Sequence, residues 1–246
     1  MEILGIDVGG TGIKGAIVNI KTGELVSKKY RIPTPEGAKP DDVADVIAKI
    51  VAHFKWKGEV GCGFPAIINH GQVLTATNIH DSWKQVHADE LFSKRTGLEF
   101  HIVNDADAAG LAAMTFGAGK DKKGTVIMIT IGTGIGSGMF YDGVLIPNIE
   151  LGTAPFRKNL NFEQYAADSV RKRENLSYKK WGKRFNEFLN FVKFLASPDL
   201  IILGGGASKK IDKFKDELTV DVPVVPSQFE NEAGIVGAAI AASRKL

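Results

Sequence analysis

Two glycine-rich turns, one in each half of the chain, contain the residue types best suited to chemistry. The first is Asp7-Val8-Gly9-Gly10-Thr11-Gly12 and the second is Gly132-Thr133-Gly134-Ile135-Gly136. Such turns gather backbone N–H groups in one concavity, and glycine tolerates positive φ and permits close approach of a phosphate. Each turn alone is also explained by the steric needs of a hairpin. The matched pair favours phosphate binding, and neither turn is a Walker A loop or a dinucleotide fingerprint.

Two charged side chains flank the first turn. Asp7 ends the first apolar run, where its carboxylate can hold Mg²⁺, often through water, next to phosphate oxygens. Lys14 follows on the next strand and can balance phosphate charge. An ordinary solvated strand lysine explains Lys14 equally well.

Asp105 lies between an apolar strand, residues 100–103, and a helix rich in small residues. We expect either Asp105 or Asp107 to cap this helix, whose amino end keeps carboxylates ionised. An ionised carboxylate within reach of a hydroxyl can accept its proton during phosphoryl transfer. Asp105 is therefore a candidate base, and the residues alone leave open a purely capping role.

Glu150 and Glu163 are candidate contacts to a sugar. A carboxylate accepts hydrogen bonds from two neighbouring hydroxyls, which suits carbohydrate ligands. Acids at such positions are also common as solvated surface groups, so the sequence by itself does not choose.

The elements that position these residues occur twice. Each half begins with strand, glycine turn and strand, and then a third strand near Leu25 or Val144. Helix and buried strand follow, and each half ends in a strand, an Asn-acid cap and a small-residue helix. The repeat predicts an α/β fold of two βββαβα domains, 1–115 and 116–246, with a cleft between them and a C-terminal helix that can pack back on the first. The alternative is one doubly wound α/β domain with coincidental turns.

Composition excludes several classes of protein. The 246 residues carry a formal charge of +3, and 44% are hydrophobic. That charge is too small to predict nucleic-acid binding, and no apolar run reaches the roughly 18 residues that cross a bilayer. The single cysteine, Cys62, excludes an intramolecular disulfide and a multi-cysteine zinc site. The first residues lack the pattern of a cleaved leader, so we expect a cytoplasmic protein without a membrane partner.

Several segments together resemble the ROK family of sugar kinases and repressors, and the match runs essentially end to end. They are IDVGGTGIKGAIV, GCGFPA, TATNI with Trp83, NDADAAG, TIGTGIGSGMF, PNIELG, IILGGGASK and NEAGIVGAA. The polyphosphate glucokinase branch is the nearest likeness, through GGTGIKGA, RIPTPEGAKPDDV, GCGFPA and SYKKWGKRF. A repressor would carry a DNA-binding extension, whereas here the phosphate strand begins at residue 3.

The resemblance implies an RNase H-like (actin/hexokinase-type) fold in each half, Mg²⁺, and ATP or polyphosphate as phosphoryl donor to the 6-hydroxyl of glucose or a related hexose. Asp105 matches the catalytic base, and Asn78, Asn104, Glu150 and Glu163 match sugar contacts. The phosphate or nucleotide positions are Asp7, Gly9, Gly10, Thr11, Lys14, Gly132, Thr133, Gly134, Gly204, Gly205 and Gly206. A homodimer is also expected from the resemblance.

Two departures from the family pattern affect these expectations. The family's Glu-Leu-Gly-His reads Glu150-Leu151-Gly152-Thr153, so a usual sugar ligand is absent and another acceptor, such as an amino sugar, becomes an alternative. A sugar-binding regulator without turnover is a second alternative. The cysteine-rich zinc motif is missing, so no structural zinc is expected.

Basic residues gather in two stretches, residues 171–184 and 209–215. An extended polyanion such as polyphosphate favours a track of this kind. A solvated helix face explains the same lysines, so the donor stays open between ATP and polyphosphate.

Overall fold

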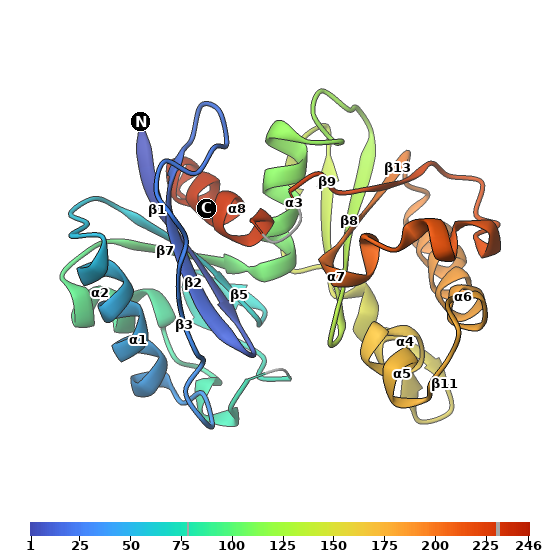
Figure 1. Ribbon diagram of the computed structural model, residues 1–246, viewed down its shortest axis with the longest axis horizontal. Helices are drawn as coiled ribbons and strands as arrows, with labels where there is room; N and C mark the ends of the chain where they lie inside the picture. Colours follow the sequence, from blue (N-terminus) through green and yellow to red (C-terminus); the bar gives the residue numbers. More distant parts are fainter. Residues whose placement is uncertain (78, 230–231) are drawn as a thin grey trace. The chain divides into compact units, whose positions relative to one another are not determined.

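The computed structural model describes residues 1–77, 79–229 and 232–246. The chain forms two compact units, Met1–Ala112 together with Glu232–Leu246, and Ala113–Asn231. The sequence repeat predicts a division after residue 115 and allows a C-terminal helix to return to the first part. In the structure, that returning segment is α8 (Ala233–Arg244), which packs on β1 and β4 of the first unit (Figure 1).

A five-stranded mixed sheet forms the centre of the first unit, in the order β3-β2-β1-β4-β7. Its strands are β1 (Glu2–Gly9), β2 (Gly12–Asn19), β3 (Tyr30–Ile32), β4 (Val60–Phe64) and β7 (Phe100–Asn104). The first three form an antiparallel meander, and β4 and β7 run parallel to β1. The carboxyl ends of β1, β4 and β7 therefore meet at one edge of the sheet.

Helices cover both faces of this sheet. On one face lies α1 (Pro40–His53), which starts with proline at its first position and buries Val43, Ile47 and Ile50. A Cβ on Gly15 would touch Ile50 of α1, whereas a Cβ on Gly5 would lie 2.1 Å from Ile235 O of α8. Gly15 pairs with Ile6, the residue after Gly5, and successive residues of a strand point to opposite faces of the sheet. The Cα hydrogens that replace side chains at Gly5 and Gly15 therefore lie on opposite faces, and α8 covers the face opposite to α1.

Close packing of α8 depends on missing side chains. A Cβ on Gly61 of β4 would lie 1.8 Å from Ala238 O, and a Cβ on Gly237 would lie 1.6 Å from Ala108 O. The small residues of α8 thus let its backbone rest directly on β4 and on α3 (Asp105–Phe116).

Shorter elements complete the first unit. They are β5 (Ile68–Asn69), β6 (Gln72–Val73), η1 (Asp81–Trp83) and α2 (Ala88–Thr96). Trp83 is fully buried, contacts the rings of Phe64 and Phe92, and donates from Nε1 to Ala38 O at 2.8 Å. This contact anchors the loop that enters α1.

The second unit repeats the arrangement with the sheet β10-β9-β8-β13-β14. Its strands are β8 (Thr125–Ile131), β9 (Ile135–Tyr141), β10 (Val144–Ile146), β13 (Leu200–Gly204) and β14 (Val224–Pro226), with a separate pair β11 (Pro155–Arg157) and β12 (Leu160–Asn161). The helices are η2 (Leu151–Thr153), α4 (Phe162–Ala166), α5 (Asp168–Arg173), α6 (Tyr178–Ala196), α7 (Gly205–Ser208), η3 (Ile211–Lys213) and η4 (Lys215–Glu217). The core of this unit centres on Trp181, Phe185 and Phe188 of α6.

The prediction of a mixed α/β fold with two sheet-and-helix units is confirmed. One detail is wrong: the third strand of the first unit starts at Tyr30 rather than near Leu25. Leu25 makes a single bridge to Val18, and the Ser27 hydroxyl then accepts the Ile17 N–H at 2.9 Å. A side chain thus takes the place of the strand's backbone at this point. Within the described ranges, no helix combines the length and apolarity that a membrane span requires.

Candidate active site

The carboxyl edge of the first sheet brings Asp7 and Asp105 to the two sides of β4, at the position of Gly63, which has no side chain. Asp7 of β1 pairs with Gly63 of β4. Asp105 follows β7, and a Cβ on Gly63 would lie 3.8 Å from Asp105 Cα. Because β1, β4 and β7 are adjacent and parallel, both predicted acids lie at the same edge.

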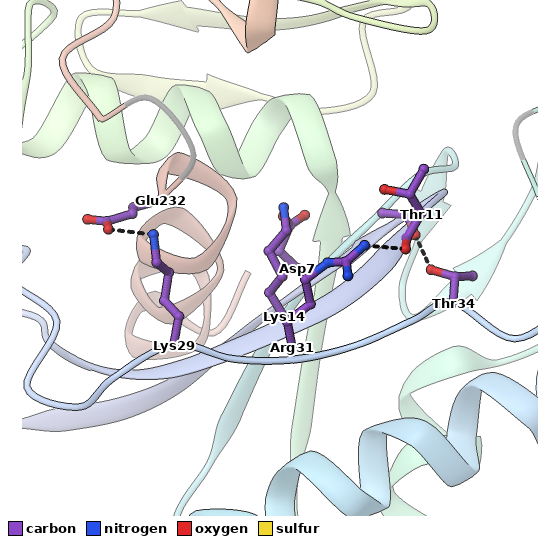
Figure 2. A network of polar contacts seen from close by, with 8 residues as sticks. Asp7, Thr11, Lys14, Lys29, Arg31, Thr34 and Glu232 are labelled. Atoms are coloured by element: carbon purple, nitrogen blue, oxygen red, sulfur yellow. Dashed lines mark hydrogen bonds and ion pairs between the residues drawn. The ribbon is translucent and has the colours of Figure 1, made fainter.

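The first glycine turn joins β1 to β2 and is fastened from outside. Arg31 Nη2 donates to Thr11 O, and Thr34 Oγ1 donates to Gly9 O at 2.5 Å (Figure 2). A Cβ on Gly12 would lie 2.4 Å from Arg31 Nε, so this glycine makes room for the arginine. Thr34 is not among the predicted site residues, although its segment RIPTPEG carries part of the family resemblance.

Gly10 differs from its neighbours because a Cβ there would meet no atom within 4 Å. The expectation that these turns use glycine for positive φ is wrong, since neither Gly10 nor Gly132 has a left-handed backbone. Neither strain nor packing requires glycine at Gly10. The open space beside the exposed Gly10 leaves room for a closely approaching group outside the chain.

Asp7 is a half-buried carboxylate whose one described ion pair is a long contact to Lys14, with Nζ to Oδ2 at 3.4 Å. Burial raises the pKa of Asp7, and the Lys14 charge opposes that rise. A Cβ on Gly234 would lie 2.9 Å from Asp7 Cγ, so glycine is needed where α8 passes the carboxylate. A hard oxygen donor that lacks full charge compensation fits a divalent cation such as Mg²⁺.

Asn104, not an acid, caps α3. Its Oδ1 accepts the N–H groups of Ala106 at 2.8 Å and Asp107 at 3.1 Å, and its Nδ2 donates to Ala66 O at 3.1 Å. The expectation that Asp105 or Asp107 is the cap is therefore wrong, because asparagine caps as well as aspartate and stands one residue earlier. Asp105 Oδ1 accepts only the adjacent Ala106 N–H among these donors, at 2.8 Å.

A cavity of about 540 Å³ lies beside the first glycine turn. Gly9, Gly10 and Thr34 line one part, and Pro65, Thr77 and His80 line another. Its volume is in the range of small-molecule sites. Asn78, a predicted sugar contact, lies outside the described residues.

The second unit gathers its glycines at an equivalent edge. The turn Gly132–Gly134 joins β8 to β9, and Gly204–Gly206 follow β13, which pairs in parallel with β8. Gly205 has φ of 75°, and a Cβ on it would lie 2.4 Å from Ile131 O, so only glycine fits there. Gly132, like Gly10, has open space where its Cβ would be.

Glu163 and Glu150 lie beside this second turn. Glu163 Oε2 accepts the Ile135 N–H at 3.0 Å, and a Cβ on Gly134 would lie 2.0 Å from the same oxygen. Burial, together with the nearby Glu163 charge, raises the pKa of Glu150. Thr153, which replaces the expected histidine, donates from Oγ1 to Glu150 O at 3.0 Å and so stabilises the turn that carries this acid.

Comparison with known proteins identifies the family. The model of the ROK family matches residues 3–149. The chain belongs to the ROK family. It is 44% identical over 238 residues to polyphosphate glucokinase of Mycobacterium tuberculosis, which covers 96% of this chain and 89% of that protein. It is 41% identical to the polyphosphate glucokinase of Mycobacterium leprae, over 97% of this chain and 74% of that one.

Solved structures agree with this assignment. The inorganic polyphosphate/ATP-glucomannokinase of Arthrobacter sp. strain KM matches with a TM-score of 0.95 and 43% identity, over 100% of this chain and 99% of that one. A ROK glucokinase of Streptomyces griseus, in complex with glucose and AMPPNP, shares the fold with a TM-score of 0.87 at 23% identity, over 99% and 100% of the two chains. The resemblance to ROK proteins and to their polyphosphate glucokinase branch is confirmed.

The raised pKa of Glu150 in this ROK protein predicts opposite effects of Glu150→Gln on stability and activity. A carboxyl whose folded pKa lies above its usual value near 4.5 costs stability as pH rises through that value and up to the raised one. The variant should therefore have a higher Tm than wild type at pH 7, and the difference should vanish below pH of about 4. Glu150 is predicted to accept hydrogen bonds from the sugar, so loss of its charge should lower kcat/KM for the sugar by roughly 10- to 100-fold.

Thermal melts at pH 7 and pH 4 and a sugar titration measure both effects. Glu187→Gln is the matched control, because Glu187 is an exposed acid on α6 that pairs with Arg157. A variant that loses Tm at pH 7 while retaining kcat/KM would contradict this interpretation of Glu150.

Proposed function

We propose that this ROK protein is a sugar kinase that transfers a phosphoryl group from polyphosphate or ATP to the 6-hydroxyl of glucose or a related hexose. The observation that carries the proposal is the pair of open glycines, Gly10 and Gly132, at equivalent turns of two homologous units. The 44% identity to polyphosphate glucokinase over nearly the whole chain supports the same activity.

In the proposed reaction, Asp105 accepts the proton of the sugar hydroxyl as its oxygen attacks the terminal phosphorus, and the bond to the donor's bridging oxygen breaks. Backbone N–H groups of Gly9, Gly10 and Thr11, and of Gly132, Thr133 and Gly134, bind phosphate oxygens. Lys14 adds positive charge. Asp7 would hold Mg²⁺, which neutralises charge on phosphate oxygens when it is bound.

The sugar contacts proposed are Asn78, Asn104, Glu150 and Glu163. Asn104 is 4% exposed, and capping of α3 fixes its side chain in the turn before Asp105. We infer that it positions Asp105 as much as it binds sugar. Gly204, Gly205 and Gly206 are proposed to lie along the adenosine when ATP is the donor.

Contact between the two basic stretches of the sequence favours polyphosphate as a donor. The Tyr178 ring has Arg171 Cζ at 4.3 Å and Lys213 Nζ at 5.2 Å from its centroid. The two basic stretches of the sequence therefore meet at Tyr178 on the second unit. Asp168 and Glu174 pair with part of this charge, whereas in the described part of the chain no carboxylate lies within 4.0 Å of the ammonium groups of Lys179, Lys180 and Lys183.

Replacing those three lysines with glutamine should raise the KM for polyphosphate about tenfold at low salt and leave the KM for ATP unchanged. The reason is that a polyanion contacts many charges at once, and salt screens such contacts over about 10 Å. Initial rates with each donor at two salt concentrations measure this. The matched control replaces Lys120, Lys122 and Lys123, three lysines of another loop. An equal rise in the KM for polyphosphate in that control would show that Lys179, Lys180 and Lys183 have no special role.

Two alternatives remain distinguishable. Thr153 stands where the family has a histidine, and its hydroxyl donates to Glu150 O. No imidazole is therefore offered to the sugar at this position, which favours a test of other acceptors, among them mannose and amino sugars. A sugar-binding regulator would bind sugar without phosphate transfer. A coupled assay for sugar phosphate over a panel of sugars, with Mg²⁺ and either ATP or polyphosphate, tests the proposal. If no sugar in the panel is phosphorylated with either donor, the proposal is overturned. The homodimer and the cytoplasmic location stay predictions.

A further inference from the structure

Three potential metal ligands meet at the edge of the first sheet opposite to Asp105. Glu59 stands just before β4, Glu99 stands just before β7, and His101 is the second residue of β7. The parallel register pairs Gly61 with His101. Each glutamate precedes one member of that pair by two residues, so all three side chains leave the same face of the sheet.

The ligand atoms are close together. His101 Nε2 lies 3.6 Å from Glu59 Oε2 and 3.5 Å from Glu99 Oε1. One nitrogen and two oxygen atoms lie within 4.8 Å of one another. Within the described ranges, this is the one group of three or more possible metal ligands. Tetrahedral zinc with bonds of about 2.0–2.2 Å separates its ligand atoms by roughly 3.3–3.6 Å.

The histidine nitrogen adds a second, independent observation. Nε2 of His101 is buried and has no hydrogen-bond partner, and the whole side chain is only 12% exposed. A buried polar atom without a hydrogen bond is rare, and a bound ion is one of its recognised explanations. The ion-pair contacts of Nε2 to both glutamates are long for hydrogen bonds, and they leave room for an ion between the three atoms.

We propose that Glu59, Glu99 and His101 form a binding site for one divalent transition-metal cation, with water in the remaining coordination position. One imidazole nitrogen and two carboxylate oxygens suit Zn²⁺ and its neighbours rather than Mg²⁺, which prefers oxygen alone. The two carboxylate charges are balanced by the cation. The cation would join the starts of β4 and β7, strands whose far ends carry Gly63 and Asp105, and therefore acts on stability rather than on the transfer step.

Zinc binding to the untagged, chelator-treated full-length protein tests the proposal. Calorimetric titration should show one Zn²⁺ per chain, and His101→Gln should weaken the dissociation constant at least tenfold. Glu59→Gln and Glu99→Gln should each weaken it in the same direction. His70→Gln, at the exposed turn between β5 and β6, is the matched control and should bind as wild type does.

Cobalt supplies a spectroscopic readout that surface binding does not. Co²⁺ held in a four-coordinate site should give visible d–d absorption well above that of aqueous Co²⁺, and His101→Gln should lower it to the level of the aqueous ion. Zinc should also raise the wild-type Tm and not that of the variant. Absence of a stoichiometric zinc event, or equal binding by His101→Gln, overturns the proposal. Sugar-kinase turnover is measured separately in the same variants, where it is expected to persist, so failure of the proposed function would leave this test intact.

Discussion

Asp105→Asn is expected to lower kcat for sugar phosphorylation by about 10²–10⁴-fold, the range that a positioned general base contributes. The amide has the shape of the carboxyl but accepts no proton at neutral pH. Asn104 caps α3 in the wild type, so the helix keeps its cap in the variant. The Tm should therefore stay near the wild-type value and sugar binding should be largely retained. Steady-state kinetics, calorimetric sugar binding and a thermal melt measure the three quantities.

Asp107→Asn is the matched control, because it makes the same chemical change two residues later on the same helix. Asp107 is 1% exposed and points away from solvent, so its replacement should affect Tm more than kcat. Ordinary turnover in Asp105→Asn would show that Asp105 is not the base. Loss of turnover in Asp107→Asn at unchanged Tm would also contradict the assignment.

Gly10→Ala and Gly132→Ala are expected to reduce kcat/KM for either phosphoryl donor by about 100-fold each without loss of Tm. A Cβ at these positions meets no protein atom within 4 Å, and neither backbone is left-handed, so the fold accepts alanine. The methyl group would instead occupy the space proposed for phosphate oxygens. Displacement of a reacting group by about 1 Å is enough for a loss of this size.

Gly61→Ala supplies the opposite pattern as a control. Its Cβ would lie 1.8 Å from Ala238 O, so α8 must move off the sheet and Tm should fall sharply, independently of any ligand. Donor kinetics and thermal melts of the three variants separate the two roles of glycine. Wild-type donor kinetics in both Gly10→Ala and Gly132→Ala would show that no phosphate approaches these turns.

The repeated elements were predictable because their signals are local. Apolar strands, glycine turns and the amphipathic helix α1 follow from the order of residues alone, and their recurrence predicts two similar units. The third strand was misplaced because Ser27 supplies a side-chain acceptor to Ile17, a contact that no periodicity reveals. The cap of α3 was misassigned because Asn104, Asp105 and Asp107 stand within four positions and all are residue types that suit a cap.

The arrangement of the site depended on tertiary contacts that the sequence does not display. Glu163 was predicted as a sugar contact, and only the structure places its carboxylate against the Gly132–Gly134 turn. Parallel pairing of β4 with β7 brings Glu59 and Glu99 together, 40 positions apart in the chain, as the register requires. Gly10 and Gly132 became informative only when the space around them was known.

The most direct test of the central claim follows glucose labelled with ¹³C at C6 by NMR, with the purified chain, Mg²⁺ and either polyphosphate or ATP. The account predicts a new C6 resonance coupled to phosphorus, formed by the wild type and lost in Asp105→Asn. Saturable binding of glucose with an unchanged C6 resonance under both donors would contradict it and would favour a sugar-binding regulator.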